Sequence, residues 1–79
     1  MVTIENFIKE ELNEYSRKVI LDCIRNGENS LKEKEEIEFN RYSLEILFSE
    51  KKVIIYDDVF SENEPLEIEL NNFTISIKQ

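Results

Sequence analysis

The segment that decides the fold is YSLEILFSEKKVIIYD, residues 42–57. Its first half alternates apolar and polar side chains, which is the period-two pattern of a strand with one buried face. A polar break at Glu50 and Lys51 follows, and residues 53–56, VIIY, are all apolar, which indicates a central strand with apolar side chains on both faces. We therefore expect two strands, at 42–49 and 52–57, in the middle of a sheet.

The neighbouring segments add strands on either side of this pair. Residues 36–40 and 66–70 both alternate glutamates with apolar residues. The last segment, 73–78, reads FTISIK and alternates again, while Asn71 and Asn72 before it can adopt the positive φ angles of a type I′ turn. The sequence therefore predicts about five short antiparallel strands. Their expected ranges are 36–40, 42–49, 52–57, 66–70 and 73–78.

The N-terminal third of the chain has the three-and-four spacing of an amphipathic helix. Thr3 suits the N-cap, Gly27 suits a left-handed C-cap, and Arg25 complements the negative end of the helix dipole. One long helix over about residues 3–26 is therefore expected. Its apolar stripe is formed by Ile4, Phe7, Ile8, Leu12, Tyr15, Val19, Ile20, Cys23 and Ile24.

One helix followed by a run of strands predicts an α+β fold, a single domain of residues 1–79 with the helix on one face of an antiparallel sheet. A helix of about 22 residues is about 33 Å long and shields only one face. The opposite face is expected to carry a patch with tyrosine hydroxyls at its edge, a composition found at protein interfaces and also on ordinary half-exposed sheets. The patch residues are Tyr42, Leu47, Ile54 and Tyr56.

The composition excludes several classes of function. The chain has 79 residues, 10 basic and 18 acidic side chains, a formal net charge of −8, one glycine, one cysteine and no histidine. Nucleic-acid binding depends on lysine and arginine clusters that are missing here. We expect no catalytic residue, cofactor or metal site, because no imidazole can act as general base or zinc ligand. The single thiol and the lack of a long apolar run favour a cytoplasmic protein without a membrane segment.

The acidic residues are concentrated in the second half of the chain. Residues 57–69 contain six acids and no lysine or arginine, and they lack the spacing of a calcium-binding loop. A negative surface of this kind accelerates encounter with a basic protein. Solubility alone is the simpler explanation of the same charge. The acidic candidates for partner binding are Asp57, Asp58, Glu62, Glu64, Glu67 and Glu69.

These features predict a small acidic protein-binding module and not an enzyme. A concrete version is an inhibitor or immunity-type protein that covers a basic partner, because the charge and the uncovered sheet face would both serve that role. The alternative is a homodimeric structural or regulatory subunit that self-associates through the predicted patch.

Overall fold

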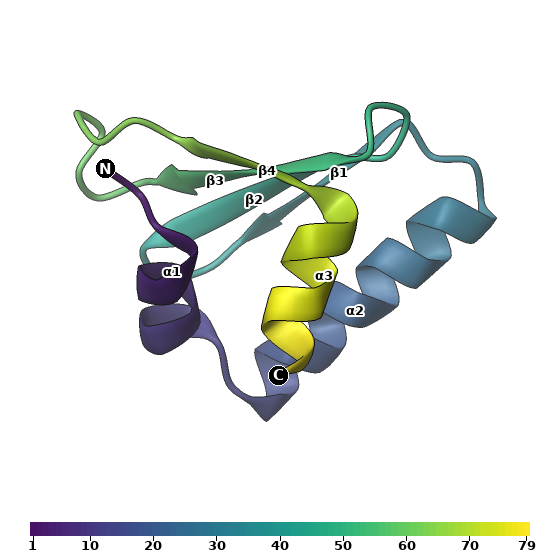
Figure 1. Ribbon diagram of the computed structural model, residues 1–79, viewed down its shortest axis with the longest axis horizontal. Coiled ribbons are helices and arrows are strands. Elements are labelled where there is room, and N and C mark those ends of the chain that lie inside the picture. Colours follow the sequence, from purple (N-terminus) through teal and green to yellow (C-terminus); the bar gives the residue numbers. More distant parts are fainter.

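The computed structural model describes residues 1–79 and has an α+β architecture, as predicted. Four strands form an antiparallel sheet in sequence order, and all three helices lie on one of its faces (Figure 1). None of the helices is long and apolar enough to cross a bilayer. The elements are α1 (Ile4–Glu11), α2 (Glu14–Asn29), β1 (Lys34–Glu38), β2 (Tyr42–Leu47), β3 (Lys52–Asp57), β4 (Leu66–Glu69) and α3 (Leu70–Lys78).

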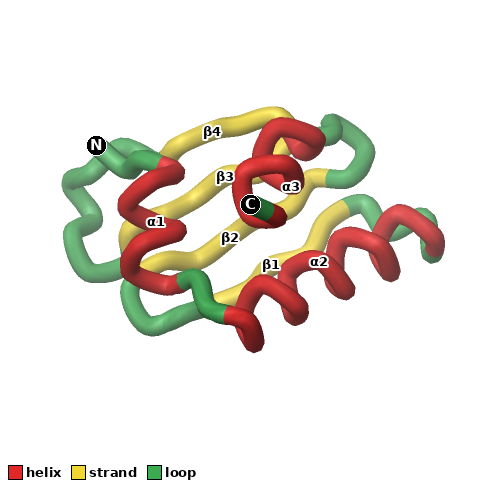
Figure 2. Tube along the Cα trace, turned by 60° about the horizontal axis from the view of Figure 1, so that its bottom comes forward, coloured by secondary structure: helices red, strands yellow, loops and turns green.

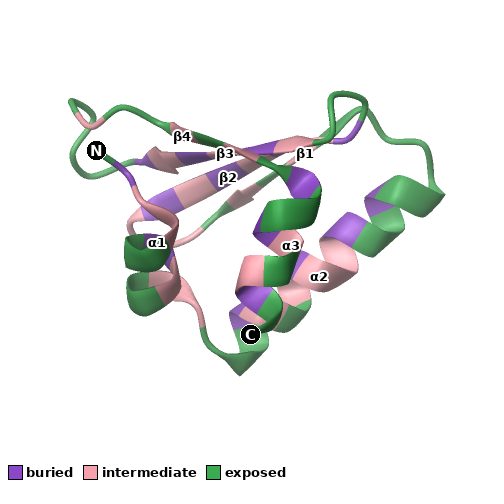
Figure 3. Ribbon diagram, in the orientation of Figure 1, coloured by how far each residue is buried: buried purple, intermediate pink, exposed green.

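The core lies between the helices and the inner face of the sheet. In the β2–β3 pair, Leu44 lies opposite Ile55 and Ile46 opposite Val53, and all four side chains are buried. Phe7 of α1 is fully buried against them and joins the layers, with its ring centroid 5.8 Å from that of Tyr42 and 6.2 Å from that of Phe73. Figure 3 shows the buried residues on the sides of the helices that face the sheet.

The expected single helix over residues 3–26 is interrupted, so that prediction is wrong. Leu12 has extended backbone angles, and Asn13 begins α2 with a capping box: its Oδ1 accepts from Ser16 N, and Ser16 Oγ accepts from Asn13 N. A cap of this kind stabilises a helix start, and so it favours two helices over one continuous helix. Thr3 does cap α1, as predicted.

The C-terminus of α2 also differs from the prediction. The helix continues past Gly27 to Asn29, and Leu31 takes the left-handed conformation with a φ of 60°. Lys32 N donates to the carbonyl of Gly27, which is the long hydrogen bond of a Schellman motif. Gly27 is therefore not the C-cap; it is buried in the helix, where Phe48 packs against it.

The last segment is a helix, α3, and the predicted fifth strand at 73–78 does not exist. Leu70, Phe73 and Ile77 are buried and share one helical face, whereas Ile75 is 57% exposed. The alternation of Phe73, Ile75 and Ile77 was compatible with a strand, but the spacing that includes Leu70 is helical. Asn71 and the residue after it lie in the first turn of this helix and form no hairpin turn.

Candidate functional site

No segment of the chain covers the second face of the sheet, which we call the outer face (Figure 1). Side chains alternate along each strand, so the pairing register decides which residues share this face. Its middle row crosses all four strands through Glu36, Glu45, Ile54 and Glu67. The full set that defines the outer face is Lys34, Glu36, Glu38, Ser43, Glu45, Leu47, Lys52, Ile54, Tyr56, Glu67 and Glu69.

Three of the four predicted patch residues form the apolar part of the outer face, which we call its apolar centre; polar residues lie among them, since Glu45 is opposite Ile54 and Lys52 is opposite Leu47. Leu47 lies on β2, and Ile54 and Tyr56 lie on β3; all three are partly exposed. The Tyr56 hydroxyl donates to Glu45 Oε1 at 3.0 Å, and burial, followed by that contact, raises the pKa of Tyr56. The centre therefore combines aliphatic side chains with a tyrosine that is already held by a carboxylate.

Tyr42, the fourth predicted patch residue, lies on the inner face, so its assignment to the patch is wrong. It is 1% exposed, because the alternation that buries Leu44 and Ile46 also buries Tyr42. Its hydroxyl donates to Glu10 Oε2 at 2.8 Å. Burial, and then this hydrogen bond, raise the pKa of Tyr42 to about 12. Tyr42 is a core residue with a partnered hydroxyl.

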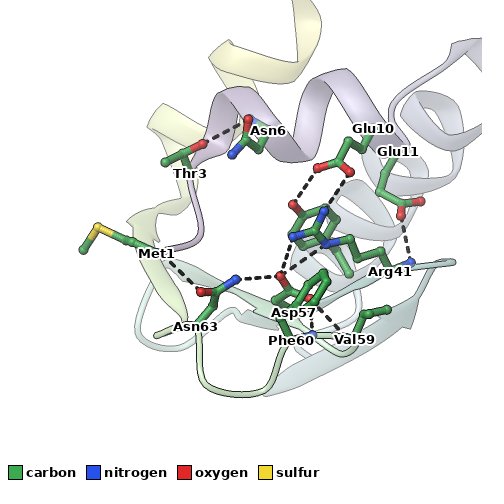
Figure 4. A network of polar contacts seen from close by, with 11 residues as sticks. Met1, Thr3, Asn6, Glu10, Glu11, Arg41, Asp57, Val59, Phe60 and Asn63 are labelled. Carbon is green, nitrogen blue, oxygen red and sulfur yellow. Dashed lines mark hydrogen bonds and ion pairs between the residues drawn. The ribbon is translucent and has the colours of Figure 1, made fainter.

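Asp57 was predicted to be an accessible acid, and this too is wrong because the residue is only 5% exposed. Oδ2 of Asp57 accepts from Arg41 Nη2 at 2.8 Å and from Asn63 Nδ2 at 3.0 Å (Figure 4). Oδ1 accepts from the backbone N–H groups of Val59 and Phe60. Arg41, and then the backbone and Asn63 donors, hold the pKa of Asp57 far below its ordinary value. Asp57 organises the β3–β4 loop and is unavailable to a partner.

Asp57, Asn63 and Arg41 form a polar cluster, and Arg41 extends it to α1. Its Nη1 lies 2.8 Å from Glu10 Oε1, and its backbone N–H donates to Glu11 Oε1 at 2.8 Å. The guanidinium carbon lies 5.0 Å from the ring centroid of Tyr42 and 5.0 Å from that of Phe60. The cluster therefore ties α1, the β1–β2 turn and the β3–β4 loop together. Sequence reasoning missed it, because hydrogen-bonding partners such as Arg41 and Glu10 are 31 positions apart in the chain.

The remaining predicted acids are all exposed, but they do not form one cluster free of bases. Glu67 forms an ion pair with Lys52 at 2.8 Å, and this contact raises the pKa of Lys52. Asp58 accepts from Ser43 Oγ at 3.1 Å. Glu69 belongs to the outer face, whereas the other two acids lie in the loop before β4. Those loop residues are Glu62 and Glu64.

Three glutamates that were not among the candidates complete the negative charge of the outer face. Glu36 and Glu38 lie on β1, and Glu45 lies on β2. With Glu67 and Glu69 they make five acids against two lysines, a formal charge of −3. The available signal was the alternation of glutamates with apolar residues along 36–39, but only the β1–β2 register places these carboxylates beside the patch.

The ion pairs on this face leave two carboxylates without a cation. Lys34 is shared between Glu36 at 3.8 Å and Glu45 at 3.5 Å, and Lys52 lies near Glu67. Glu38 and Glu69 form no salt bridge. The charged residues of the outer face, which we call its rim, can therefore still accept lysine or arginine. The rim consists of Lys34, Glu36, Glu38, Glu45, Lys52, Glu67 and Glu69.

The arrangement contains no group of three carboxylate or thiol side chains positioned to hold a metal ion. Cys23 is half-buried on α2, and burial raises the pKa of its thiol, which disfavours the reactive thiolate. Comparison with protein families, with curated proteins and with solved structures finds no match to this chain.

Proposed function

We propose that this protein is a small acidic protein-binding module of the cytoplasm that docks a basic protein on its outer face. One observation carries the proposal: a whole face of the sheet is uncovered (Figure 1) and presents three apolar side chains among charged ones whose net charge is negative. An inhibitor or immunity-type protein that covers a basic partner is its most concrete form.

The two parts of the outer face would contribute differently to binding. An exposed ion pair at the rim contributes only about 0–1 kcal/mol, whereas complete burial of an apolar side chain contributes about 1.5–3 kcal/mol. Leu47, Ile54 and Tyr56 would therefore provide most of the affinity. The rim would raise the association rate and reject acidic proteins.

The charge of the rim favours the proposed function over the homodimeric alternative. A second copy docked face to face would place two surfaces of formal charge −3 against each other, and like charges across an interface are unfavourable. A partner with lysine or arginine around an apolar centre removes that repulsion. Glu38 and Glu69, which have no cation in the free protein, are the first acceptors for such side chains.

The test uses the full chain to capture proteins from its native host, followed by affinity measurement with each purified candidate. Ile54→Asp introduces a charge into the centre of the outer face, and Ile75→Asp is its matched control, because Ile75 is 57% exposed on α3, on the other side of the sheet. We expect Ile54→Asp to weaken binding by at least about tenfold and Ile75→Asp to leave it unchanged. Raising NaCl from about 0.05 to 0.5 M should also weaken binding, because salt screens rim charges.

Two results would contradict the proposal. One is a partner whose affinity is insensitive to salt and to Ile54→Asp. The other is a doubled mass in light scattering at about 100 μM that Ile54→Asp returns to a monomer. The second result would establish the homodimeric alternative in its place.

A further inference from the structure

β1 is an edge strand whose second edge pairs with no other strand. Phe48 N donates to the carbonyl of Glu33, and Phe39 N donates to the carbonyl of Tyr42, so the odd-numbered residues of this strand bond to β2. In an antiparallel ladder the intervening residues direct their N–H and C=O groups to the opposite edge. These residues are Lys34, Glu36 and Glu38.

Helix α2 runs beside β1 (Figure 2). Residues of these two elements line a groove next to the free edge of β1. One hollow of about 580 Å³ has four apolar lining residues, Tyr15, Val19, Ile37 and Phe39. A second hollow of about 430 Å³ is lined by Val19, Cys23 and Ile37 among polar residues. Because Val19 and Ile37 line both hollows, the two are neighbouring parts of one groove.

We propose that β1 accepts an extended segment of a basic protein as a fifth strand, with alternating apolar and basic side chains. The apolar side chains enter the groove, while the basic ones lie on the outer face beside Glu36 and Glu38. The identity of the partner as a basic protein rests on the proposed function; the use of this edge is a separate claim.

Geometry and charge both favour this occupant. An added strand lies about 4.8 Å from β1 and repeats its side chains on each face about every 7 Å, so it extends the existing rows of the outer face by one residue each. In those rows Glu38 has no ion pair, and Glu36 only shares Lys34 at 3.8 Å. Lysine or arginine on the added strand satisfies both carboxylates. A second copy is disfavoured, because each chain has a formal net charge of −8.

The probe is the peptide acetyl-KVKVKVK-amide, titrated into the ¹⁵N-labelled chain and followed by amide shifts in two-dimensional NMR spectra. We expect shifts in Lys34–Glu38 and in Val19 and Cys23, which face the groove. A scrambled peptide, KKKKVVV, has the same charge and should bind at least about tenfold more weakly, because it cannot separate apolar and basic side chains between two faces.

Backbone methylation of the probe tests hydrogen bonding to the edge. One version is N-methylated on its lysines and another on its valines, which removes N–H donors from opposite edges of the peptide without changing its charge. We expect one version to lose at least about tenfold in affinity and the other to retain binding. Which of the two loses affinity depends on whether the added strand runs antiparallel or parallel to β1. Equal effects of the two methylations overturn the proposal.

Variants of the chain give a second test. Glu36→Pro removes an N–H that β2 does not use, and Glu36→Ala removes the same charge but keeps the N–H. We expect both variants to keep the circular dichroism spectrum of the wild type, and only Glu36→Pro to abolish the amide shifts that the peptide causes. Bound peptide should also slow alkylation of Cys23, the only cysteine, at least about fivefold in the wild type. Unchanged Cys23 alkylation with saturating peptide contradicts the proposal.

These outcomes separate the edge proposal from the proposed function. Peptide shifts confined to Leu47, Ile54 and Tyr56 overturn addition at β1 and leave a docking role for the outer face intact. A native partner that responds to Ile54→Asp but not to Glu36→Pro does the same. A doubled mass that Glu36→Pro abolishes also overturns the proposal, because the edge then accepts a second copy.

Discussion

Arg41 and Asp57 meet at one end of the sheet, where Nε and Nη2 of the guanidinium lie 3.2 and 2.8 Å from the same carboxylate oxygen, Oδ2. The second oxygen, Oδ1, accepts two backbone N–H groups of the β3–β4 loop. The Asp57 side chain is 1% exposed and that of Arg41 is 30% exposed. Water therefore has little access to replace the hydrogen bonds that Asp57 accepts. The conformation of the loop thus depends on one buried negative charge.

Asp57→Asn should destabilise the protein strongly. The amide has one acceptor oxygen, so it cannot serve both Arg41 and the loop N–H groups, and the guanidinium loses one of its two carboxylate partners. We expect the melting temperature to fall by at least about 5 °C. Asp58→Asn is the matched control, because exposed Asp58 accepts only from Ser43 Oγ, and it should shift the temperature by less than about 2 °C. Equal shifts would mean that Asp57 has no special structural role.

The same carboxylate should make the fold acid-sensitive. Arg41 holds the pKa of Asp57 below its usual range in the folded protein, whereas in the unfolded chain the pKa is about 3.9. A lowered folded-state pKa contributes stability that is complete above the unfolded value and is lost as the pH falls towards the folded value. Urea midpoints measured from pH 7 to 2 should therefore decrease below about pH 4, and this decrease should be smaller in Asp57→Asn. Parallel curves for the two proteins would exclude Asp57 as its source.

Tyr42 should make the stability of the fold decrease at alkaline pH, in the opposite direction to the effect of Asp57. Its folded-state pKa is raised from 10.0 to about 12, mainly by burial, so the neutral hydroxyl is the folded form. The stability contributed by this group is present below the unfolded pKa of about 10 and is lost as the pH rises towards 12. Tyr42→Phe should weaken the alkaline decline in the urea midpoint between pH 9.5 and 12 while lowering stability at pH 7 by about 1 kcal/mol, through the lost bond to Glu10. An unchanged alkaline slope in the variant would contradict the assignment.

Alanine substitutions in the C-terminal segment distinguish the observed helix from the predicted strand. Phe73 is fully buried, so Phe73→Ala should reduce the free energy of unfolding by about 3–5 kcal/mol. Ile75 is 57% exposed on α3, so Ile75→Ala should change it by less than about 1 kcal/mol. A strand would put Phe73 and Ile75 on the same face and give both substitutions similar effects in urea denaturation.

The sheet was predictable because its signal is local. The alternation in 42–49 and the continuous apolar run in 53–56 depend only on neighbours in the sequence, and β2 and β3 occupy these segments. The open outer face follows from the same alternation. The misplacement of Tyr42 was avoidable, since it differs by two positions from Leu44 and so shares its face.

The C-terminal helix and the polar cluster were less accessible to sequence reasoning. FTISIK by itself satisfies a period of two, while Leu70 adds a helical spacing, and packing of Phe73 and Ile77 against the other helices selects the helical period. The contacts among Glu10, Arg41 and Asp57 exist only after the sheet and α1 are in place. The break in the first helix did have a local signal, the capping pair of Asn13 and Ser16.

Gly27→Ala should destabilise the protein although Gly27 lies inside a helix. At an exposed site, replacing a helical glycine by alanine stabilises by about 1 kcal/mol. Here the added methyl would overlap the ring of Phe48, which is only 8% exposed and has little room to move, and overpacking of this kind destabilises by about 1–3 kcal/mol. The net loss should be about 1 kcal/mol in urea denaturation.

The adjacent exposed residue supplies the control, since Asn26→Ala adds no contact with Phe48 and should be neutral or slightly stabilising. In a Phe48→Leu background the smaller side chain vacates part of the overlapping volume, so Gly27→Ala should lose less stability there than in the wild type. If Gly27→Ala instead stabilises the wild type as it would an exposed helix, the close packing of α2 on the end of β2 is wrong.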